Sequence, residues 1–140
     1  MTGPPVDPVL VDSNVLLDVA TKDPKWHCWS EAALATAANE SILVINPLVY
    51  AEVSVAYKRI EDVEAVLPST VFRRDRLPYE AAFLAGKAFL QYRKRGGAHR
   101  APMPDFYIGA HAAVAGFRLL TRDVTRYKTY FPTVVLISPG

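Results

Sequence analysis

Short apolar runs alternate with segments of helical character along this chain, and this alternation restricts its possible folds more than any other feature. The runs that read as strands lie at 9–11, 41–45, 70–75, 118–122 and 133–137. Helical spacing or a helix-start signal marks the segments at 13 onward, 24–40, 46–60, 78–95 and 106–117. Strands separated by helices of this length indicate a parallel sheet with helices on both faces. The sequence therefore predicts a three-layer α/β/α sandwich around a central, mostly parallel sheet.

Helix boundaries are marked most clearly at residue 46. Asn46 suits an N-cap position, and Pro47 suits the first helical position. Ser13 could cap the helix that follows the first strand, and Asp12 is the alternative cap. The helix that starts at 46 is expected to continue through 61–67 or to break there. Glycine and proline are frequent in 96–105, which predicts a loop.

Length and composition indicate one domain, residues 1–140, in which 1–7 form a loose tail. The chain has 140 residues, of which 51% are hydrophobic and 21% charged. No apolar run approaches the roughly 18 residues of a membrane span, and the first residues lack the features of a signal peptide, so a cytoplasmic location is expected. The single cysteine, Cys28, excludes an internal disulfide and a cysteine-based zinc site, and is expected to be a small buried side chain.

Four acidic residues stand where an unpaired carboxylate is costly or where ligands bind. Asp12 follows the first predicted strand, and Asp123 follows the strand at 118–122. In open parallel sheets, ligands bind outside these carboxyl ends. Glu52 falls within the apolar stripe of its predicted helix, where burial without a partner is unfavourable. Asp105 stands directly before the helix predicted at 106–117.

Each acid also has a purely structural explanation. Asp12 and Asp105 could cap helices, Asp123 could start a turn, and Glu52 could pair with a buried arginine. These explanations require four separate coincidences, whereas one metal site at one sheet edge accounts for all four acids. Because carboxylate oxygens without histidine or thiolate favour hard cations, we expect Mg²⁺ or Mn²⁺.

A metal site of this kind predicts phosphoryl chemistry. One or two ions held by carboxylates clamp the attacking and leaving oxygens of a phosphoryl centre, and a metal-bound water serves as the nucleophile. No protein nucleophile is required. Ser13, Asn14 and Thr121 lie beside the predicted strand ends, where they are expected to orient the carboxylates or the metal-bound water.

Four blocks of sequence occur in a distinctive order: LVDSNVLLD at 10–18, NPLVYAEV at 46–53, PDFYIGAHA at 104–112 and LLTRD at 119–123. In this order and spacing the chain resembles the PIN domain family, in particular the VapC-type toxins of bacterial toxin–antitoxin pairs. The resemblance implies a PIN-like fold and a metal-dependent endoribonuclease whose acidic site is Asp12, Glu52, Asp105 and Asp123. It also implies homodimers, an RNA substrate, and inhibition by a small antitoxin protein whose tail occupies the acidic pocket.

The fourth block departs from part of that family. Some relatives carry a further acid near it, whereas here Thr121 and Arg122 precede Asp123 and no acid follows within reach. The resemblance therefore does not extend to tight occupancy of a second metal site.

Basic residues gather close to the acids in the sequence. They are Arg93, Lys94, Arg95, His99 and Arg100, which precede Asp105, and Arg122, which precedes Asp123. We expect them to contact RNA phosphates. The alternative explanation for the first group is a solvated helix end, in which cations complement the helix dipole and Gly96 stops the helix.

Other functions remain open at this point. The same fold and metal site would suit an RNA-processing nuclease that has no antitoxin. A phosphoaspartate phosphatase or receiver domain would need a second acid close to Asp12, yet Asn14 stands two positions later, and no suitable lysine follows a later strand. A non-catalytic RNA-binding module is disfavoured because the acids are intact.

Overall fold

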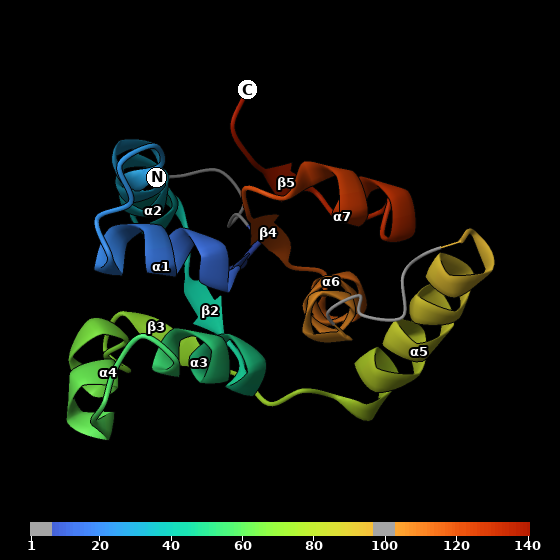
Figure 1. Cartoon of the computed structure of the whole chain (residues 1–140), viewed down its shortest axis with the longest axis horizontal. Helices are drawn as coiled ribbons and strands as arrows, with labels where there is room; N and C mark the ends of the chain where they lie inside the picture. Colours follow the sequence, from blue (N-terminus) through green and yellow to red (C-terminus); the bar gives the residue numbers. More distant parts are fainter. Residues whose placement is uncertain (1–6, 97–102) are drawn as a thin grey trace, which may run out of the picture.

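The computed structural model describes residues 7–96 and 103–140, and its centre is a five-stranded, all-parallel sheet (Figure 1). The strand order is β3-β2-β1-β4-β5. The strands are β1 (Val9–Val11), β2 (Leu43–Ile45), β3 (Phe72–Arg74), β4 (Arg118–Leu120) and β5 (Leu136–Ile137). All five predicted strands are therefore present, and the predicted parallel sheet is confirmed.

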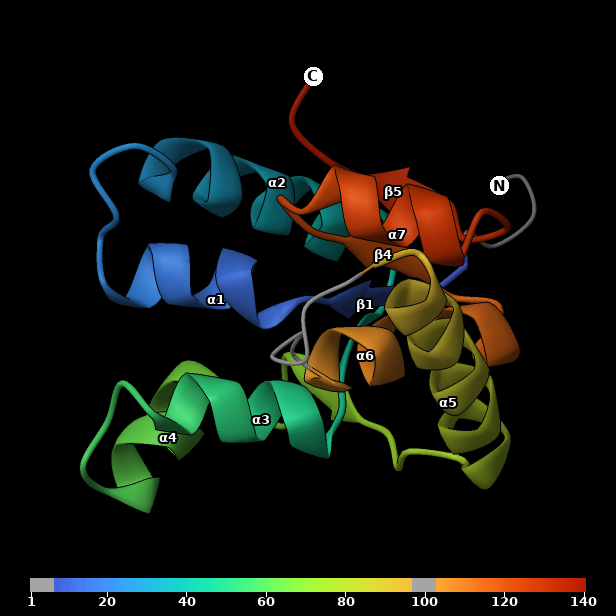
Figure 2. The ribbon, with the colours of Figure 1, turned by 45° about the vertical axis from the view of Figure 1, so that its right-hand side comes forward.

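Seven helices surround the sheet in the described residues and complete the predicted three-layer arrangement (Figures 1 and 2). They are α1 (Ser13–Ala20), α2 (His27–Glu40), α3 (Pro47–Ser54), α4 (Ile60–Val66), α5 (Tyr79–Lys94), α6 (Met103–Ala115) and α7 (Val124–Tyr130). The longest helix, α5, packs along α6, whereas α1 packs against α2 and α3. No helix in the described ranges is long and apolar enough to cross a membrane.

The burial of the strands agrees with their places in the sheet. Every residue of β1 and β2 is buried, as expected for central strands covered on both faces. The edge strand β3 buries Phe72 but exposes Arg73 and Arg74. Register then positions the strand ends, because Val11 pairs with Leu120 across β1 and β4. The residues that follow these two strands consequently lie next to each other.

Two helix starts can be compared with the sequence-based expectations. Asn46 accepts a hydrogen bond from the backbone N–H of Val49 at 3.0 Å, and Pro47 is the first residue of α3, as predicted. Of the two candidate caps of α1, Ser13 is not the cap, because α1 begins at Ser13 itself and Asp12 takes the N-cap position. The chain passes from β1 into α1 without a spare residue, and neither side chain bonds the helix backbone as a cap.

Other boundaries differ from the predictions in instructive ways. The chain breaks at 55–59, before the stretch 61–67 where a break was expected, and a separate helix, α4, covers most of that stretch. Helix α6 begins at Met103, so the predicted loop at 96–105 is too long at its carboxyl end; residues 97–102 lie outside the described part. Helix α7 was not predicted, because its polar sequence VTRYKTY has little apolar periodicity. Cys28 is exposed, so the prediction of burial was wrong.

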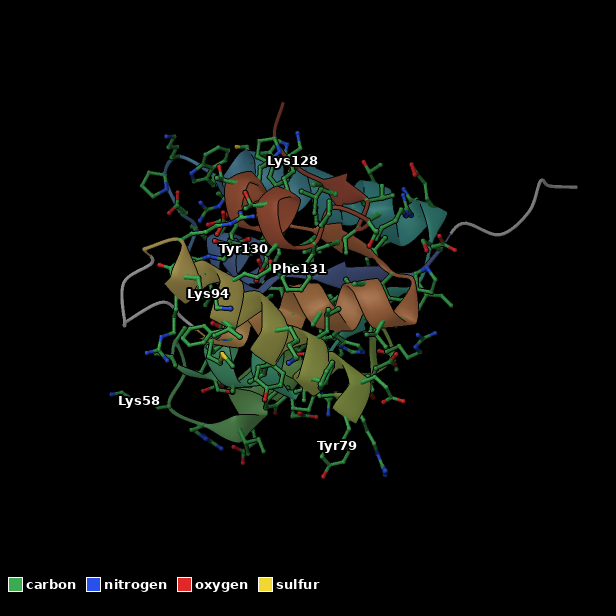
Figure 3. The ribbon with its side chains drawn as sticks, turned by 90° about the vertical axis from the view of Figure 1, so that its right-hand side faces the viewer. Lys58, Tyr79, Lys94, Lys128, Tyr130 and Phe131 are labelled. Atoms are coloured by element: carbon green, nitrogen blue, oxygen red, sulfur yellow. The ribbon has the colours of Figure 1, made fainter. Side chains whose placement is uncertain are left out.

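Aromatic packing joins the last helices. The ring of Phe106 on α6 lies 5.5 Å from the rings of Phe89 and Tyr92 on α5 and from that of Tyr130 on α7, all edge-on. Phe131, labelled with Tyr130 in Figure 3, lies over Gly109 so closely that a Cβ atom there would come within 2.4 Å of the ring. These contacts fix α7 against α6 and thereby position the side chains that α7 carries.

Candidate active site at the carboxyl edge of the sheet

Asp12 and Thr121 follow neighbouring strands and meet at the carboxyl edge of the sheet. The backbone N–H of Asp12 donates to the carbonyl of Leu120 at 2.9 Å, which extends the ladder between β1 and β4 by one bond. The hydroxyl of Thr121 then donates to Oδ2 of Asp12, also at 2.9 Å. The two residues are 109 positions apart in the sequence. Strand order and register alone bring them together.

One oxygen of Asp12 collects three hydrogen bonds. Besides Thr121, the hydroxyl of Tyr127 donates to Oδ2 at 3.0 Å, and the side-chain amide of Asn14 donates to it at 3.3 Å. The Asp12 residue is only 3% exposed. Burial raises the pKa of its carboxyl from 3.8 to about 6; the charges of Asp105 and Glu52 add to the rise, whereas the two hydroxyl donors oppose it.

Ser13 links Asp12 to Glu52. Its hydroxyl lies 2.8 Å from Oε1 of Glu52, and 3.5 Å from Oδ1 of Asp12. Helix α3 therefore presents Glu52 to the start of α1, and no ion pair to Glu52 occurs in the described residues, unlike the alternative of a buried arginine partner. Burial raises the pKa of Glu52; the bond from Ser13 opposes this rise, and the charge of Asp105 adds to it.

Asp105 lies in the first turn of α6, where a carboxylate also complements the helix dipole. Its Oδ2 forms an ion pair with Nη1 of Arg126 on α7. Burial raises the pKa of Asp105; the positive charge of Arg126 counteracts the rise, and the negative charge of Asp123 contributes to it. Asp105 is thus the acid that carries a cationic partner.

Asp123 occupies the N-cap position of α7, without a capping bond from its side chain. Its backbone N–H donates to the Thr121 hydroxyl at 3.0 Å, so Thr121 contacts both the first and the last of the four acids. The predicted acids consequently influence one another's pKa values. The charge of Asp105 adds to the raised pKa of Asp12 and of Glu52, and the charge of Asp123 adds to that of Asp105.

The chemistry of this donor set fits a hard divalent cation. All four side chains are carboxylates, and Asp12 and Glu52 have no cationic partner among the described residues. Over the same residues, however, no three acidic, histidine or cysteine side chains gather closely enough to enclose an ion. Asp12, Glu52, Asp105 and Asp123 could hold a metal only if their oxygens turned toward one another.

Two contributors to the site escaped the sequence analysis. Arg126 and Tyr127 lie on α7, the helix that was not predicted. A signal was nevertheless available, because they follow Asp123 by three and four positions and a helix would place all three on one face. Tyr127 is completely buried. Its own pKa is raised well above the ordinary value by burial and by the charge of Asp12.

Asn14 and Arg122 have distinct places in the structure. The side-chain amide of Asn14 donates to Asp12 and to the Thr121 hydroxyl, each at 3.3 Å. Its carbonyl oxygen accepts from the backbone N–H of Arg122, also at 3.3 Å. The guanidinium of Arg122, an expected RNA contact, forms an ion pair with buried Asp18 and lies 5.1 Å from the ring centroid of Trp26. It is occupied inside the protein, so we assign Arg122 to holding this loop.

Three of the other predicted basic residues lie at the end of α5. Arg93 and Lys94 form its last turn, and Arg95 takes the C-cap position. The guanidinium of Arg95 lies 5.4 Å from the ring centroid of Tyr130, which places this basic end beside α7 (Lys94 and Tyr130 are labelled in Figure 3). His99 and Arg100 lie outside the described residues.

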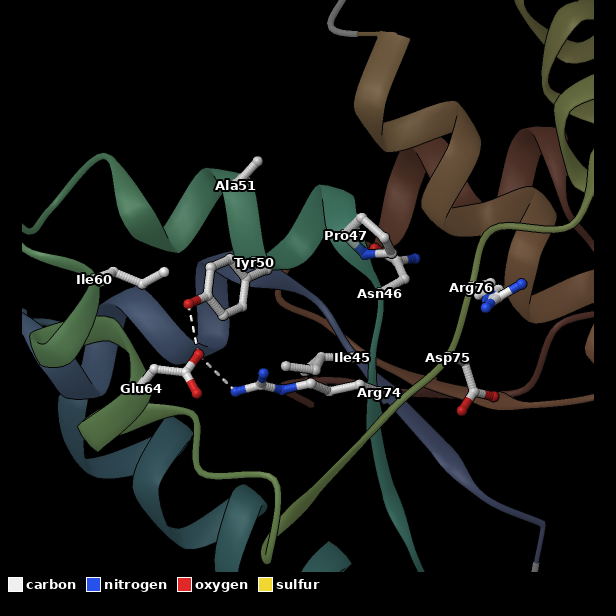
Figure 4. A pocket seen from close by; sticks show the side chains of 10 residues that line it. All are labelled: Ile45, Asn46, Pro47, Tyr50, Ala51, Ile60, Glu64, Arg74, Asp75 and Arg76. Carbon is white, nitrogen blue, oxygen red and sulfur yellow. Dashed lines mark hydrogen bonds and ion pairs between the residues drawn. The ribbon is translucent and has the colours of Figure 1, made fainter.

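A separate cavity of about 480 Å³ lies beyond the carboxyl ends of β2 and β3 (Figure 4). Its wall includes Tyr50, whose hydroxyl donates to Glu64 at 2.6 Å, and Arg74, which also donates to Glu64 at 2.8 Å. None of the four acids lines this cavity. It is therefore distinct from the acidic site.

Comparison with protein families identifies a match over most of the chain. The family model for the PIN domain matches residues 9–131. No curated protein matches the sequence.

Solved structures with a similar fold include toxin–antitoxin proteins. One is the VapBC2 structure from Rickettsia felis bound to a DNA fragment from its promoter (TM-score 0.73, 17% identity, 95% of this chain and 99% of that chain). Another is VapBC-1 from nontypeable Haemophilus influenzae (TM-score 0.71, 17% identity, 94% and 97%). A third is VapC20 from Mycobacterium tuberculosis, a toxin that cleaves the sarcin–ricin loop (TM-score 0.58, 16% identity, 79% and 85%). At these identities the similarity is one of fold.

Proposed function

Since this chain belongs to the PIN domain family, we propose that it is a metal-dependent endoribonuclease and the toxin of a toxin–antitoxin pair. The observation that carries the proposal is the coupled group of four acids at the carboxyl edge, in which buried Asp12 has no cationic partner among the described residues. Burying an acid in this way destabilises the folded state. A bound divalent ion would offset that destabilisation, which supports a metal site as the role of these acids.

The four acids would hold Mg²⁺ or Mn²⁺. When bound, such an ion supplies Lewis acidity to a phosphoryl centre and lowers the pKa of water. The chain itself supplies orientation. Thr121, Tyr127 and Asn14 donate to one oxygen of Asp12 and restrain its carboxylate, and Ser13, at the start of α1, donates to Glu52.

An RNA substrate and a protein antitoxin are the partners that this proposal requires. RNA cleavage is supported by the fold shared with VapC20, which cleaves the sarcin–ricin loop, and an antitoxin is supported by the fold shared with VapBC complexes. The basic end of α5, residues 93–95, would contact RNA phosphates beside the acids, with His99 and Arg100 continuing that segment in the sequence. The cytoplasm, where RNA and the antitoxin occur together, is the proposed location.

A homodimer is also part of the proposal, and α5 offers a surface for it. Tyr79, Phe83 and Leu90 are 91%, 69% and 45% exposed and recur at helical spacing along one side of α5 (Tyr79 is labelled in Figure 3). Large apolar side chains exposed on one helix face are characteristic of interfaces. Phe83→Asp should therefore convert dimers to monomers in sedimentation experiments, whereas Val55→Asp, at the exposed C-cap of α3, serves as the control.

The experiment that tests the function compares wild type with Asp12→Asn in cells. Both proteins are expressed from the same inducible promoter, and the 5′-phosphate ends of cellular RNA are mapped before and after induction. New ends and growth arrest are expected for wild type only. Identical RNA ends in the two strains would contradict the proposal, and equal protein levels on a blot exclude a trivial loss of the variant.

RNA contact by α5 is tested separately in the non-cleaving Asp12→Asn background. Arg93→Ala with Lys94→Ala should weaken binding and reduce the dependence of affinity on salt, because about two phosphate contacts disappear. Lys58→Ala with Arg59→Ala removes the same charge from an exposed segment before α4 and is the matched control. Equal salt slopes for the two double variants would remove the α5 end from the RNA surface.

A further inference from the structure

Asp105 is the central charge of the acidic site. Its charge raises the pKa of both Asp12 and Glu52, and Asp123 acts on it in turn. Asp105 is thus the acid whose charge interacts with each of the other three, and an ion bound among these carboxylates would lie close to it. Yet Asp105 is also the acid that a side chain of the protein already neutralises, through its ion pair with Arg126.

Arg126 is held in place by more than this pair. Its guanidinium carbon lies 5.7 Å from the ring centroid of Phe106 and 5.9 Å from that of Tyr92. Both rings belong to the aromatic cluster that joins α5, α6 and α7. Only 23% of the Arg126 side chain is exposed. The rings also provide a second favourable surface for the cation, so the guanidinium can leave the carboxylate without losing all of its partners.

We infer that Arg126 is an internal counter-ion, which occupies Asp105 in the metal-free protein and competes with the divalent ion for that carboxylate. This inference rests on the proposed metal-dependent function. It explains why the four acids are coupled while no three of them gather closely in the described residues. With Oδ2 of Asp105 directed to Arg126 on α7, the guanidinium offsets part of the repulsion that Asp105 exerts on Asp12 and Glu52.

The two possible roles of Arg126 predict opposite changes in metal affinity. If Arg126 merely positioned Asp105 for the metal, removing it would weaken metal binding. If Arg126 competes, removing it strengthens metal binding, because the ion no longer displaces a guanidinium and no longer approaches a fixed positive charge. A partly exposed ion pair contributes up to about 1 kcal/mol, which corresponds to about a fivefold change in affinity.

The test is a calorimetric titration of Mn²⁺ into the chelator-treated full-length protein. Arg126→Gln is expected to bind Mn²⁺ about fivefold more tightly than wild type. Lys128→Gln is the matched control, because it removes the same charge from an exposed position of the same helix (labelled in Figure 3). The affinity of Lys128→Gln should stay close to that of wild type. Arg126→Met, which keeps the alkyl stem against the rings, serves as a second variant should Arg126→Gln fold poorly.

Thermal unfolding gives a readout independent of affinity measurements. Without metal, Arg126→Gln should melt at a lower temperature than wild type, and saturating Mn²⁺ should raise its Tm by more. If wild type binds Mn²⁺ but Arg126→Gln binds it equally or more weakly, the counter-ion role is overturned and the metal-dependent function stands. If neither wild type nor the Arg126 variants bind Mn²⁺, both ideas are overturned.

Discussion

The guanidinium of Arg122 forms a two-point ion pair with the buried carboxylate of Asp18, at 2.6 Å from Nε to Oδ2 and 2.9 Å from Nη2 to Oδ1. Ser30 on α2 donates to the same carboxylate at 2.6 Å. The pair thereby ties α1 and α2 to the connection between β4 and α7. That connection carries Thr121 and Asp123, so a contact outside the acidic site holds two of its members in place.

Breaking this pair should destabilise the protein strongly. Arg122→Gln leaves the carboxylate of Asp18, which is 3% exposed, without its cation, and should lower the free energy of unfolding by about 3–5 kcal/mol. Urea denaturation measures the loss. Arg73→Gln breaks the more exposed pair with Asp75 and should cost less than about 1 kcal/mol. In Asp18→Asn with Arg122→Gln, part of the loss should be recovered; equal losses in the two single arginine variants would refute the assignment.

Asp12→Asn should stabilise the metal-free protein at neutral pH. Burial raises the pKa of Asp12 from 3.8 to about 6, so the folded state holds this proton more tightly than the unfolded state. The contribution of Asp12 to the free energy of unfolding therefore decreases as the pH rises from about 4 to about 6, and above that range it lowers this free energy by about 3 kcal/mol. Asparagine retains an acceptor for the three donors and carries no charge.

The measurement is urea unfolding of wild type and Asp12→Asn in chelator between pH 4 and pH 8. The difference between the two proteins should be small at pH 4 and should grow with pH until it levels off above about 6. Glu40→Gln, an exposed acid at the end of α2, should change stability by less than about 0.5 kcal/mol throughout. A difference that shrinks with rising pH would show that Asp12 is stabilised as a carboxylate.

Tyr127→Phe should raise the pKa of Asp12 further. The Tyr127 hydroxyl donates to the ionised carboxylate and opposes the effect of burial, so its removal favours the protonated form. Carbon-13 NMR of the aspartate carboxyls in metal-free protein follows the titration directly. Tyr130→Phe removes a hydroxyl from the same helix without touching Asp12 and should leave the titration unchanged. An Asp12 titration that is the same in both variants would mean that Tyr127 serves packing alone.

Gly109→Ala should destabilise the contact between α6 and the end of α7. The new Cβ atom would lie 2.4 Å from the ring of Phe131, and overpacking of this kind costs about 1–3 kcal/mol. Gly86→Ala on α5 meets no atom within 4 Å and should instead stabilise the helix by about 0.5–1 kcal/mol. Thermal unfolding of both variants checks the pair. The loss at Gly109 should be smaller in a Phe131→Leu background, and losses that simply add would exclude the clash.

The sequence by itself determined the parts of this protein that depend on a few neighbouring residues. The apolar runs predicted all five strands, and Asn46 with Pro47 marked the start of α3. Asp12 and Asp123 follow apolar runs and were therefore expected at strand ends, and the carboxyl ends of parallel strands lie at one edge of the sheet. Capping, periodicity and strand direction act over short windows, so the chain alone reveals them.

Only the tertiary structure decided which polar groups meet. Ser13 contacts Glu52 across 39 positions and Tyr127 contacts Asp12 across 115, and no local pattern encodes either pairing. They follow from β1 lying between β2 and β4, from the register of those strands, and from aromatic packing that sets α7 against α6. Hydrogen bonds and ion pairs depend on ångström-scale distances, and such distances between remote segments exist only once the sheet has assembled.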